Sequence, residues 1–148
     1  MPHVRPLDLD EAHLAFPALR ELRPASGAVV SPEAFQQAMS QAYAQGYRLA
    51  GSFDTSGEVA AAVAGYRLQT NLAYGLFLYL DDLSTLPGAR GRGHAAALLA
   101  WLEDEARRQG CRELHLDSGV GPHRFTAHRQ YLKAGLNIVS HHFAKGLS

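Results

Sequence analysis

Two glycines and two arginines alternate in the segment Arg90-Gly91-Arg92-Gly93, immediately before a stretch with helical periodicity. Glycines at a helix N-terminus leave the backbone N–H groups uncovered, and these groups, together with the helix dipole, favour a bound anion. The arginine side chains add positive charge at the same place. The combination predicts a diphosphate site, and the alternative interpretation is a flexible glycine turn with solvated arginines.

The same glycines also fit a dinucleotide-binding fingerprint, Gly91-x-Gly93-x-x-Ala96, in which Asp117 would bind a ribose. Only about 30 residues follow Asp117, and the residues before the turn do not alternate as repeated strand–helix units. A two-halved nucleotide fold therefore fits the chain poorly, but a dinucleotide-binding domain stays open as an alternative function. A Walker-type loop is excluded because the chain contains no Gly-Lys-Ser/Thr.

A strand and a helix must position this turn. Residues 77–86 are apolar and β-prone and end in a Pro-Gly pair, which predicts a strand. From Ala95 onward, apolar residues recur at spacings of three and four and predict an amphipathic helix, which Gly110 ends in a left-handed conformation. Alternation around Leu114 predicts the next strand. A crossover of this length implies that the two strands are parallel.

The predicted central strand contains two adjacent carboxylates, Asp81 and Asp82, and a change of side-chain parity. Leu78 and Leu80 alternate on one face, whereas Leu83 falls on the opposite register. A β-bulge among these residues would restore the alternation and free backbone groups on one side of the strand. The alternative is that both faces of the strand are buried. Asp81 and Asp82 are candidate bases or ligands for a cationic acceptor, and Asp82 is the preferred one.

The rest of the chain predicts an α+β fold in a single domain of residues 1–148. The sheet is expected to be mixed and mostly antiparallel, with the parallel strand–helix–strand crossover and helices on both faces. Pro17 is expected to kink or restart the first helix, and residues 54–57 predict a hairpin turn. The further predicted elements are strands at His3–Leu7, 47–53, 59–68 and 137–143, and helices at 8–22, 31–46 and 124–134.

Composition is that of an ordinary soluble globular protein, with 47% hydrophobic and 19% charged residues. Fourteen basic and fourteen acidic residues cancel, so charge favours neither nucleic acid nor an anionic membrane as a partner. The single cysteine, Cys111, excludes an internal disulfide and predicts a cytoplasmic location. His123 and His128 are candidate bases near neutral pH. Their spacing is not that of a metal-ligand pair and no cysteine joins them, so no metal is expected.

Two motifs resemble those of the GNAT-type N-acetyltransferases. Residues 90–95, Arg-Gly-Arg-Gly-His-Ala, resemble the Arg/Gln-x-x-Gly-x-Gly/Ala loop of that family. Residues 127–136 resemble its second motif, Ala-x-x-x-Tyr-x-x-x-Gly-Phe, with Leu136 in place of the phenylalanine. The two motifs follow in the family's order and spacing. The resemblance covers the chain from Leu76 onward and the first 75 residues only in outline.

The resemblance implies that acetyl-CoA is the cosubstrate and that its thioester is attacked directly by an amine. The acceptor would be an amine-bearing small molecule, a protein N-terminus or a lysine, held by the first pair of helices. A homodimer is also expected from the family. A non-catalytic acyl-CoA-binding module stays open as the other alternative, because a phosphate loop alone does not prove turnover.

The resemblance also assigns roles to residues. Tyr131, the tyrosine of the second motif, would protonate the leaving thiolate, and a phenol is protonated at neutral pH. A backbone N–H near Leu83 or Ser84 would stabilise the oxyanion. The residues expected to bind acetyl-CoA are Leu83, Ser84 and Thr85 beside the pantetheine arm, and Arg90, Gly91, Arg92, Gly93, His94 and Ala95 around the pyrophosphate.

Overall fold

The computed structural model describes residues 1–54 and 58–148, so the hairpin turn predicted at 54–57 lies largely outside the described residues. The chain divides into two compact units, Met1–Leu116 and Asp117–Ser148. Across the described part of the chain, no helix is long and apolar enough to cross a bilayer.

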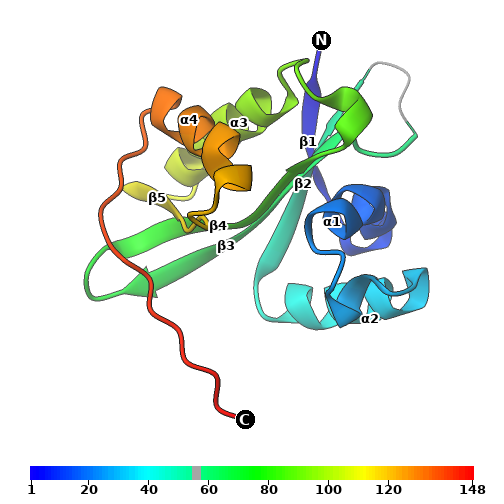
Figure 1. Cartoon of the computed structure of the whole chain (residues 1–148), viewed down its shortest axis with the longest axis horizontal. Coiled ribbons are helices and arrows are strands. Elements are labelled where there is room, and N and C mark those ends of the chain that lie inside the picture. The colour runs from blue at the N-terminus through cyan, green and yellow to red at the C-terminus, as the bar shows by residue number, and fades with distance from the viewer. Residues whose placement is uncertain (55–57) are drawn as a thin grey trace. The chain divides into compact units, whose positions relative to one another are not determined.

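A five-stranded mixed sheet lies at the centre of the first unit (Figure 1). Its strands lie side by side in chain order: β1 (His3–Leu7), β2 (Tyr47–Phe53), β3 (Ala62–Asn71), β4 (Gly75–Thr85) and β5 (Glu113–Leu116). The first four strands are antiparallel to their neighbours, and β5 is parallel to β4. The predicted α+β fold with a mostly antiparallel sheet and one parallel crossover is therefore confirmed.

Helices cover both faces of this sheet, as predicted (Figure 1). On one face, Leu49 of β2 belongs to the buried cluster that also contains side chains of α1 (Phe16–Leu22) and α2 (Pro32–Ala44). On the other face, the hydroxyl of Ser52 contacts the first residue of α3 (His94–Arg108). Because residues 49 and 52 differ in parity, they point to opposite sides of the strand. The central part of the sheet thus lies between two layers of helix.

The first predicted helix is divided near Pro17, where either a kink or a restart of the helix was expected from the sequence. A 3₁₀ helix covers Leu9–Ala15, and α1 then begins so that Pro17 occupies its first turn. The missing N–H of proline costs no hydrogen bond there. The second helix begins as predicted, with the Ser31 hydroxyl accepting a hydrogen bond from the Ala34 N–H at 3.1 Å.

Strand β3 lies three residues later in the chain than the predicted 59–68. Before its start, the Ala60 N–H donates to the carbonyl of Leu14 in the 3₁₀ helix, so this residue does not pair with a neighbouring strand through its N–H. At its end, the Asn71 side chain accepts a hydrogen bond from the Tyr74 N–H at 2.8 Å. This side-chain contact closes a tight turn, and β3 therefore runs on to Asn71.

The β-bulge predicted in the central strand is confirmed. Leu80 pairs with Tyr66 and Asp82 pairs with Gly65, so Asp81 is an extra residue with no counterpart on β3. Pairing between β4 and β5 stops at Leu80. Beyond that point, among the residues that the structure describes, only β3 pairs with β4, and the opposite edge of β4 has no strand beside it.

The second unit contains α4 (Phe125–Lys133), which ends before Gly135 with φ at +93°, as predicted. The strand predicted at 137–143 is wrong, because residues 136–148 form neither helix nor strand. Ile138 and Val139 are adjacent, so they break the apolar–polar alternation of a half-buried strand. No strand among the described residues pairs with this segment, and an unpaired strand is not stable in water.

Candidate active site

The turn before α3 has the geometry that its glycines predict. Gly91 and Gly93 have φ values of +80° and +85°, a region that strains residues with a Cβ. Gly93 is the N-cap of α3, and no side chain caps this helix end. The first N–H groups of α3 therefore lack a side-chain acceptor, and the helix terminus is suited to an anion. Arg90 is exposed beside it.

The His94 side chain anchors this helix end to β2. It is 1% exposed, with Nδ1 at 2.8 Å from the Ser52 hydroxyl and Nε2 at 3.1 Å from a carboxylate oxygen of Asp54. Asp54 also lies 3.3 Å from the Arg92 guanidinium. The imidazole is thus directed into the protein, and the backbone N–H is the part of His94 suited to a phosphate. Local sequence patterns do not reveal the roles of Ser52 and Asp54, because their contacts join residues 38 or more positions apart.

Replacing His94 with Ala is expected to lower the free energy of unfolding by about 2–3 kcal/mol. The change opens a cavity and leaves the buried Ser52 hydroxyl without its imidazole partner. Urea unfolding followed by circular dichroism measures the effect. A double variant that also carries Ser52→Ala should cost less than the two single changes added together. Wild-type stability in the His94→Ala variant would contradict the anchoring role.

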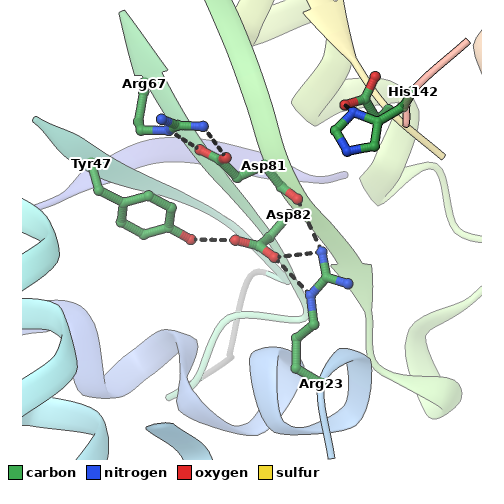
Figure 2. A network of polar contacts seen from close by, with 7 residues as sticks. Arg23, Tyr47, Arg67, Asp81, Asp82 and His142 are labelled. Atoms are coloured by element: carbon green, nitrogen blue, oxygen red, sulfur yellow. Dashed lines mark hydrogen bonds and ion pairs between the residues drawn. The ribbon is translucent and has the colours of Figure 1, made fainter. Parts of the chain in front are cut away.

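Asp81 and Asp82 line one pocket of about 400 Å³ on the sheet face that carries α1 and α2 (Figure 2). Adjacent residues of a regular strand point to opposite faces, but the bulge turns both carboxylates to the same face. The sequence could not decide which of the two would face a pocket, and the structure brings both there. The lining residues are Arg23, Ala42, Gln45, Tyr47, Arg67, Asp81 and Asp82.

Each carboxylate has its own arginine partner (Figure 2). Arg67 on β3 donates two hydrogen bonds to Asp81, at 2.8 and 2.7 Å, in the bidentate geometry that makes such pairs strong. Arg23, which follows α1, donates from Nε to Asp82 at 3.0 Å and from Nη2 to the Asp81 carbonyl at 3.1 Å. The Arg23 side chain is 55% exposed and that of Arg67 is 36% exposed. The Arg23–Asp82 pair is therefore the more hydrated of the two.

Tyr47 holds the other oxygen of Asp82. Its hydroxyl donates to Oδ2 at 2.8 Å, and burial, reinforced by the Asp82 carboxylate, raises the pKa of Tyr47 well above its ordinary value. The Tyr47 ring lies against Gly65 of β3, where an added Cβ would stand only 1.7 Å from the hydroxyl oxygen. Gly65 therefore permits this close approach. A glycine inside an apolar strand was the signal in the sequence for such a contact.

The strand segment expected to contact pantetheine, Leu83 to Thr85, continues β4 beyond the bulge. Its residues pair with β3 on one edge. Alternate residues of a strand direct their N–H and C=O groups toward the opposite edge, which has no strand partner within the described residues. This edge can accept the amide groups of an extended ligand. The Ser84 side chain is buried, so its contribution would come from the backbone.

Tyr131 lies on α4 in the second unit, and its side chain is 9% exposed. Burial raises the pKa of its phenol, and the nearby Arg124 guanidinium opposes part of this shift. The hydroxyl is consequently protonated at neutral pH and can give up a proton but not accept one as a base. This is the protonation state that the role of acid requires.

Other polar groups of the second unit are held by their neighbours. His128 Nε2 lies 2.7 Å from the Gly119 carbonyl and 3.1 Å from the Ser118 hydroxyl. His142 Nδ1 lies 3.2 Å from a carboxylate oxygen of Asp117, the residue that a dinucleotide site would use for the ribose. Within the described ranges, three side chains lie close enough together to share a metal ion, and they are Asp8, Asp10 and Glu11.

Sequence comparisons identify relatives of this chain. Residues 16–136 match a family model described as the acetyltransferase (GNAT) family. The aminoalkylphosphonate N-acetyltransferase of Salmonella typhimurium is 37% identical over 68 residues, which are 46% of this chain and 43% of that enzyme. The chain therefore matches less than half the length of this curated relative.

Solved structures share the whole fold at low identity. An aminoglycoside N-acetyltransferase in complex with CoA superposes with a TM-score of 0.82 at 16% identity, covering 99% of this chain and 95% of that chain. A ribosomal-protein-alanine N-acetyltransferase from Brucella melitensis gives a TM-score of 0.80 at 17% identity, covering 100% of both chains. At these identities, the likeness shows the fold alone.

Proposed function

The chain belongs to the acetyltransferase (GNAT) family, whose members use acetyl-CoA as cosubstrate, and on this basis we propose that it transfers the acetyl group to an amine acceptor. The observation that carries the proposal is the course of β4. Its bulge places Asp81 and Asp82 in one pocket, and its C-terminal end leads through the turn to the uncapped N-terminus of α3. One strand thus joins a candidate acceptor pocket to a candidate diphosphate site.

Acetyl-CoA would bind along this path. Its pyrophosphate would accept hydrogen bonds from the backbone N–H groups at the N-terminus of α3, with Arg90 and Arg92 adding positive charge. The amides of its pantetheine arm would pair with the free edge of β4 at Leu83–Thr85. Arg92, now paired with Asp54, would share its guanidinium with the pyrophosphate.

The proposed reaction is a direct attack of the amine on the thioester. The acceptor enters as an ammonium ion and loses one proton to water, and its nitrogen lone pair attacks the carbonyl carbon. A C–N bond forms and the C–S bond breaks. Tyr131 gives its proton to the departing thiolate and regains one from the acylated nitrogen. The products are the N-acetyl amine, CoA and one released proton. Asp82 would hold the acceptor in the pocket.

The proposal takes residues 1–148 as one acyltransferase domain. The family match runs through residues 16–136 and so includes parts of both compact units. The phosphate-loop motif lies in the first unit and the tyrosine motif in the second. Neither unit carries both motifs, and acetyl transfer is therefore expected to need the whole chain.

Calorimetric titration of acetyl-CoA and, separately, of NAD into the full chain tests this proposal. Micromolar binding of acetyl-CoA that Arg90→Ala weakens is expected, followed by amine-dependent release of free CoA. Amines for the assay include an amino acid, an aminoalkylphosphonate, an aminoglycoside and a peptide N-terminus. No binding of acetyl-CoA would overturn the proposal, and preferential binding of NAD would support a dinucleotide domain. Binding without turnover would support the non-catalytic module.

Replacing Tyr131 with Phe is expected to lower kcat by about 10²-fold, because the leaving thiolate loses its acid. The affinity for acetyl-CoA should change little. Since the pKa of Tyr131 is raised above its usual value near 10, its protonated form persists through mildly alkaline pH. The pH profile of wild-type kcat should therefore show no decline attributable to this phenol between pH 7 and 9. An unchanged kcat in the Phe variant would contradict the assignment.

A further inference from the structure

We propose that the acceptor is a small zwitterionic amine, a molecule that carries an anionic group a few bonds from its ammonium group. The inference rests on the proposed acetyl transfer and concerns its acceptor. The pocket volume of about 400 Å³ is that of a small-molecule site. Its lining carries two carboxylates and two guanidinium groups, so its charges balance and both signs are present. A ligand with both signs of charge complements such a lining.

The two ion pairs of the pocket differ in how readily a ligand can enter them. Arg67 and Asp81 are joined by two parallel hydrogen bonds, a geometry that fixes both side chains. Arg23 contacts only one oxygen of the Asp82 carboxylate, Oδ1, which lies 3.0 Å from both Nε and Nη2, and more than half of its side chain is exposed. The Arg23–Asp82 pair is therefore the one that a ligand exchanges.

A zwitterion makes this exchange favourable on both sides. Its ammonium takes the place of Arg23 on Oδ1 of Asp82, while the Tyr47 hydroxyl keeps Oδ2 in position. The freed Arg23 guanidinium then pairs with the anionic group of the same molecule. A second hydrogen bond, from Arg23 to the Asp81 carbonyl, keeps the guanidinium at the pocket. One ion pair is given up, and two are formed.

The same charges disfavour acceptors without an anionic group. An ammonium on Asp82 would then stand beside the Arg23 guanidinium with a single carboxylate between the two cations. Asp81 gives little relief, because Arg67 already neutralises it. A diamine would bring a further positive charge into the same pocket. Like charges at such distances raise the free energy of the complex.

Four acceptors of similar size test the proposal: 3-aminopropanoate, 2-aminoethylphosphonate, 3-aminopropanamide and 1,3-diaminopropane. The value of kcat/KM is measured from free CoA release at saturating acetyl-CoA and compared at equal concentrations of free amine. At least one of the two zwitterions is expected to exceed the amide by about tenfold or more, which corresponds to one good ion pair. The diamine is expected to be the poorest acceptor.

An Arg23→Gln variant identifies the group that selects the anion. It should lower kcat/KM for the preferred zwitterion about tenfold and shrink the ratio of zwitterion to amide. Arg20→Gln is the matched control, because Arg20 lies on α1, packs over the Phe16 ring and does not line the pocket. This control should retain the wild-type ratio.

The possible outcomes distinguish a failure of the acceptor inference from a failure of the proposed acetyl transfer. Acetylation of the amide or the diamine as fast as both zwitterions would overturn the acceptor inference and leave acetyl transfer standing. Binding of acetyl-CoA without acetylation of any of the four would also overturn it. An unchanged ratio of kcat/KM for the zwitterion to that for the amide in the Arg23→Gln variant would show that Arg23 does not select the anionic group. Failure of the protein to bind acetyl-CoA would instead overturn the proposed function itself.

Discussion

Replacing Gly93 with Asp is expected to reduce the affinity for acetyl-CoA by at least about 10³-fold. The new carboxylate would stand at the N-terminus of α3, where the pyrophosphate is proposed to bind. Two like charges about 4 Å apart in a partly screened site repel by about 4 kcal/mol, which is close to 10³ in affinity. Gly93 has φ at +85°, so the added Cβ also strains the turn. Calorimetric titration measures the loss.

The matched control is Gly93→Asn, which has nearly the same shape and no charge. Asn tolerates left-handed backbone better than most residues, so this variant should fold and lose much less affinity than Gly93→Asp. The carboxylate variant should fold too, because a negative charge at a helix N-terminus is favourable. Equal affinities in the two variants would show that charge at this position is irrelevant and that no anion binds there.

Replacing Gly65 with Ala is expected to destabilise the chain by about 3 kcal/mol and to lower kcat/KM at least tenfold. The added Cβ would stand 1.7 Å from the Tyr47 hydroxyl oxygen and 2.4 Å from the ring carbon that bears it. Tyr47 must move. The overpacking destabilises the folded state, and the movement breaks the hydrogen bond from Tyr47 to the Asp82 carboxylate. Urea unfolding and the acetylation assay measure the two losses.

Two further variants separate folding from function at this contact. Gly27→Ala is a matched control, because nothing lies within 4 Å of the added Cβ, and it should leave stability and rate close to wild type. Combining Gly65→Ala with Tyr47→Leu removes the overlapping hydroxyl and should recover stability relative to Gly65→Ala alone. The rate should stay low, because Asp82 still lacks the hydrogen bond from Tyr47. Recovery of the rate would contradict the positioning role of Tyr47.

Local patterns in the sequence predicted the elements that carry the candidate site. The parity of Leu83 against Leu80 predicted the bulge, and the glycines of residues 91–93 predicted the helix start. Each signal lies within a few residues, where backbone preference and side-chain alternation act directly. The α+β fold and its parallel crossover followed from the order of such elements.

The partners of the carboxylates could not be predicted in the same way. Tyr47 and Arg67 face each other across β2 and β3, so their meeting depends on the register between strands that are 20 residues apart in the chain. Arg23 reaches Asp82 across 59 positions. Patterns among neighbouring residues of the sequence do not predict contacts between residues so far apart in the chain. The strand predicted at 137–143 failed for a related reason, because apolar residues alone do not supply a pairing partner.

The bulge at Asp81 has a consequence for how this site arose and how it can be altered. The extra residue brings both acids into one pocket, and the pairing of β4 with β5 ends at the residue just before it. In genetic terms, a single codon supplies the second acid of the pocket. Deleting that codon would place Asp82 directly after Leu80, in regular alternation and still opposite Gly65 on the pocket face. The pocket would keep Asp82 but lose the Asp81 carboxylate, the bidentate partner of Arg67, and point substitutions could not restore the second acid without reinserting a residue.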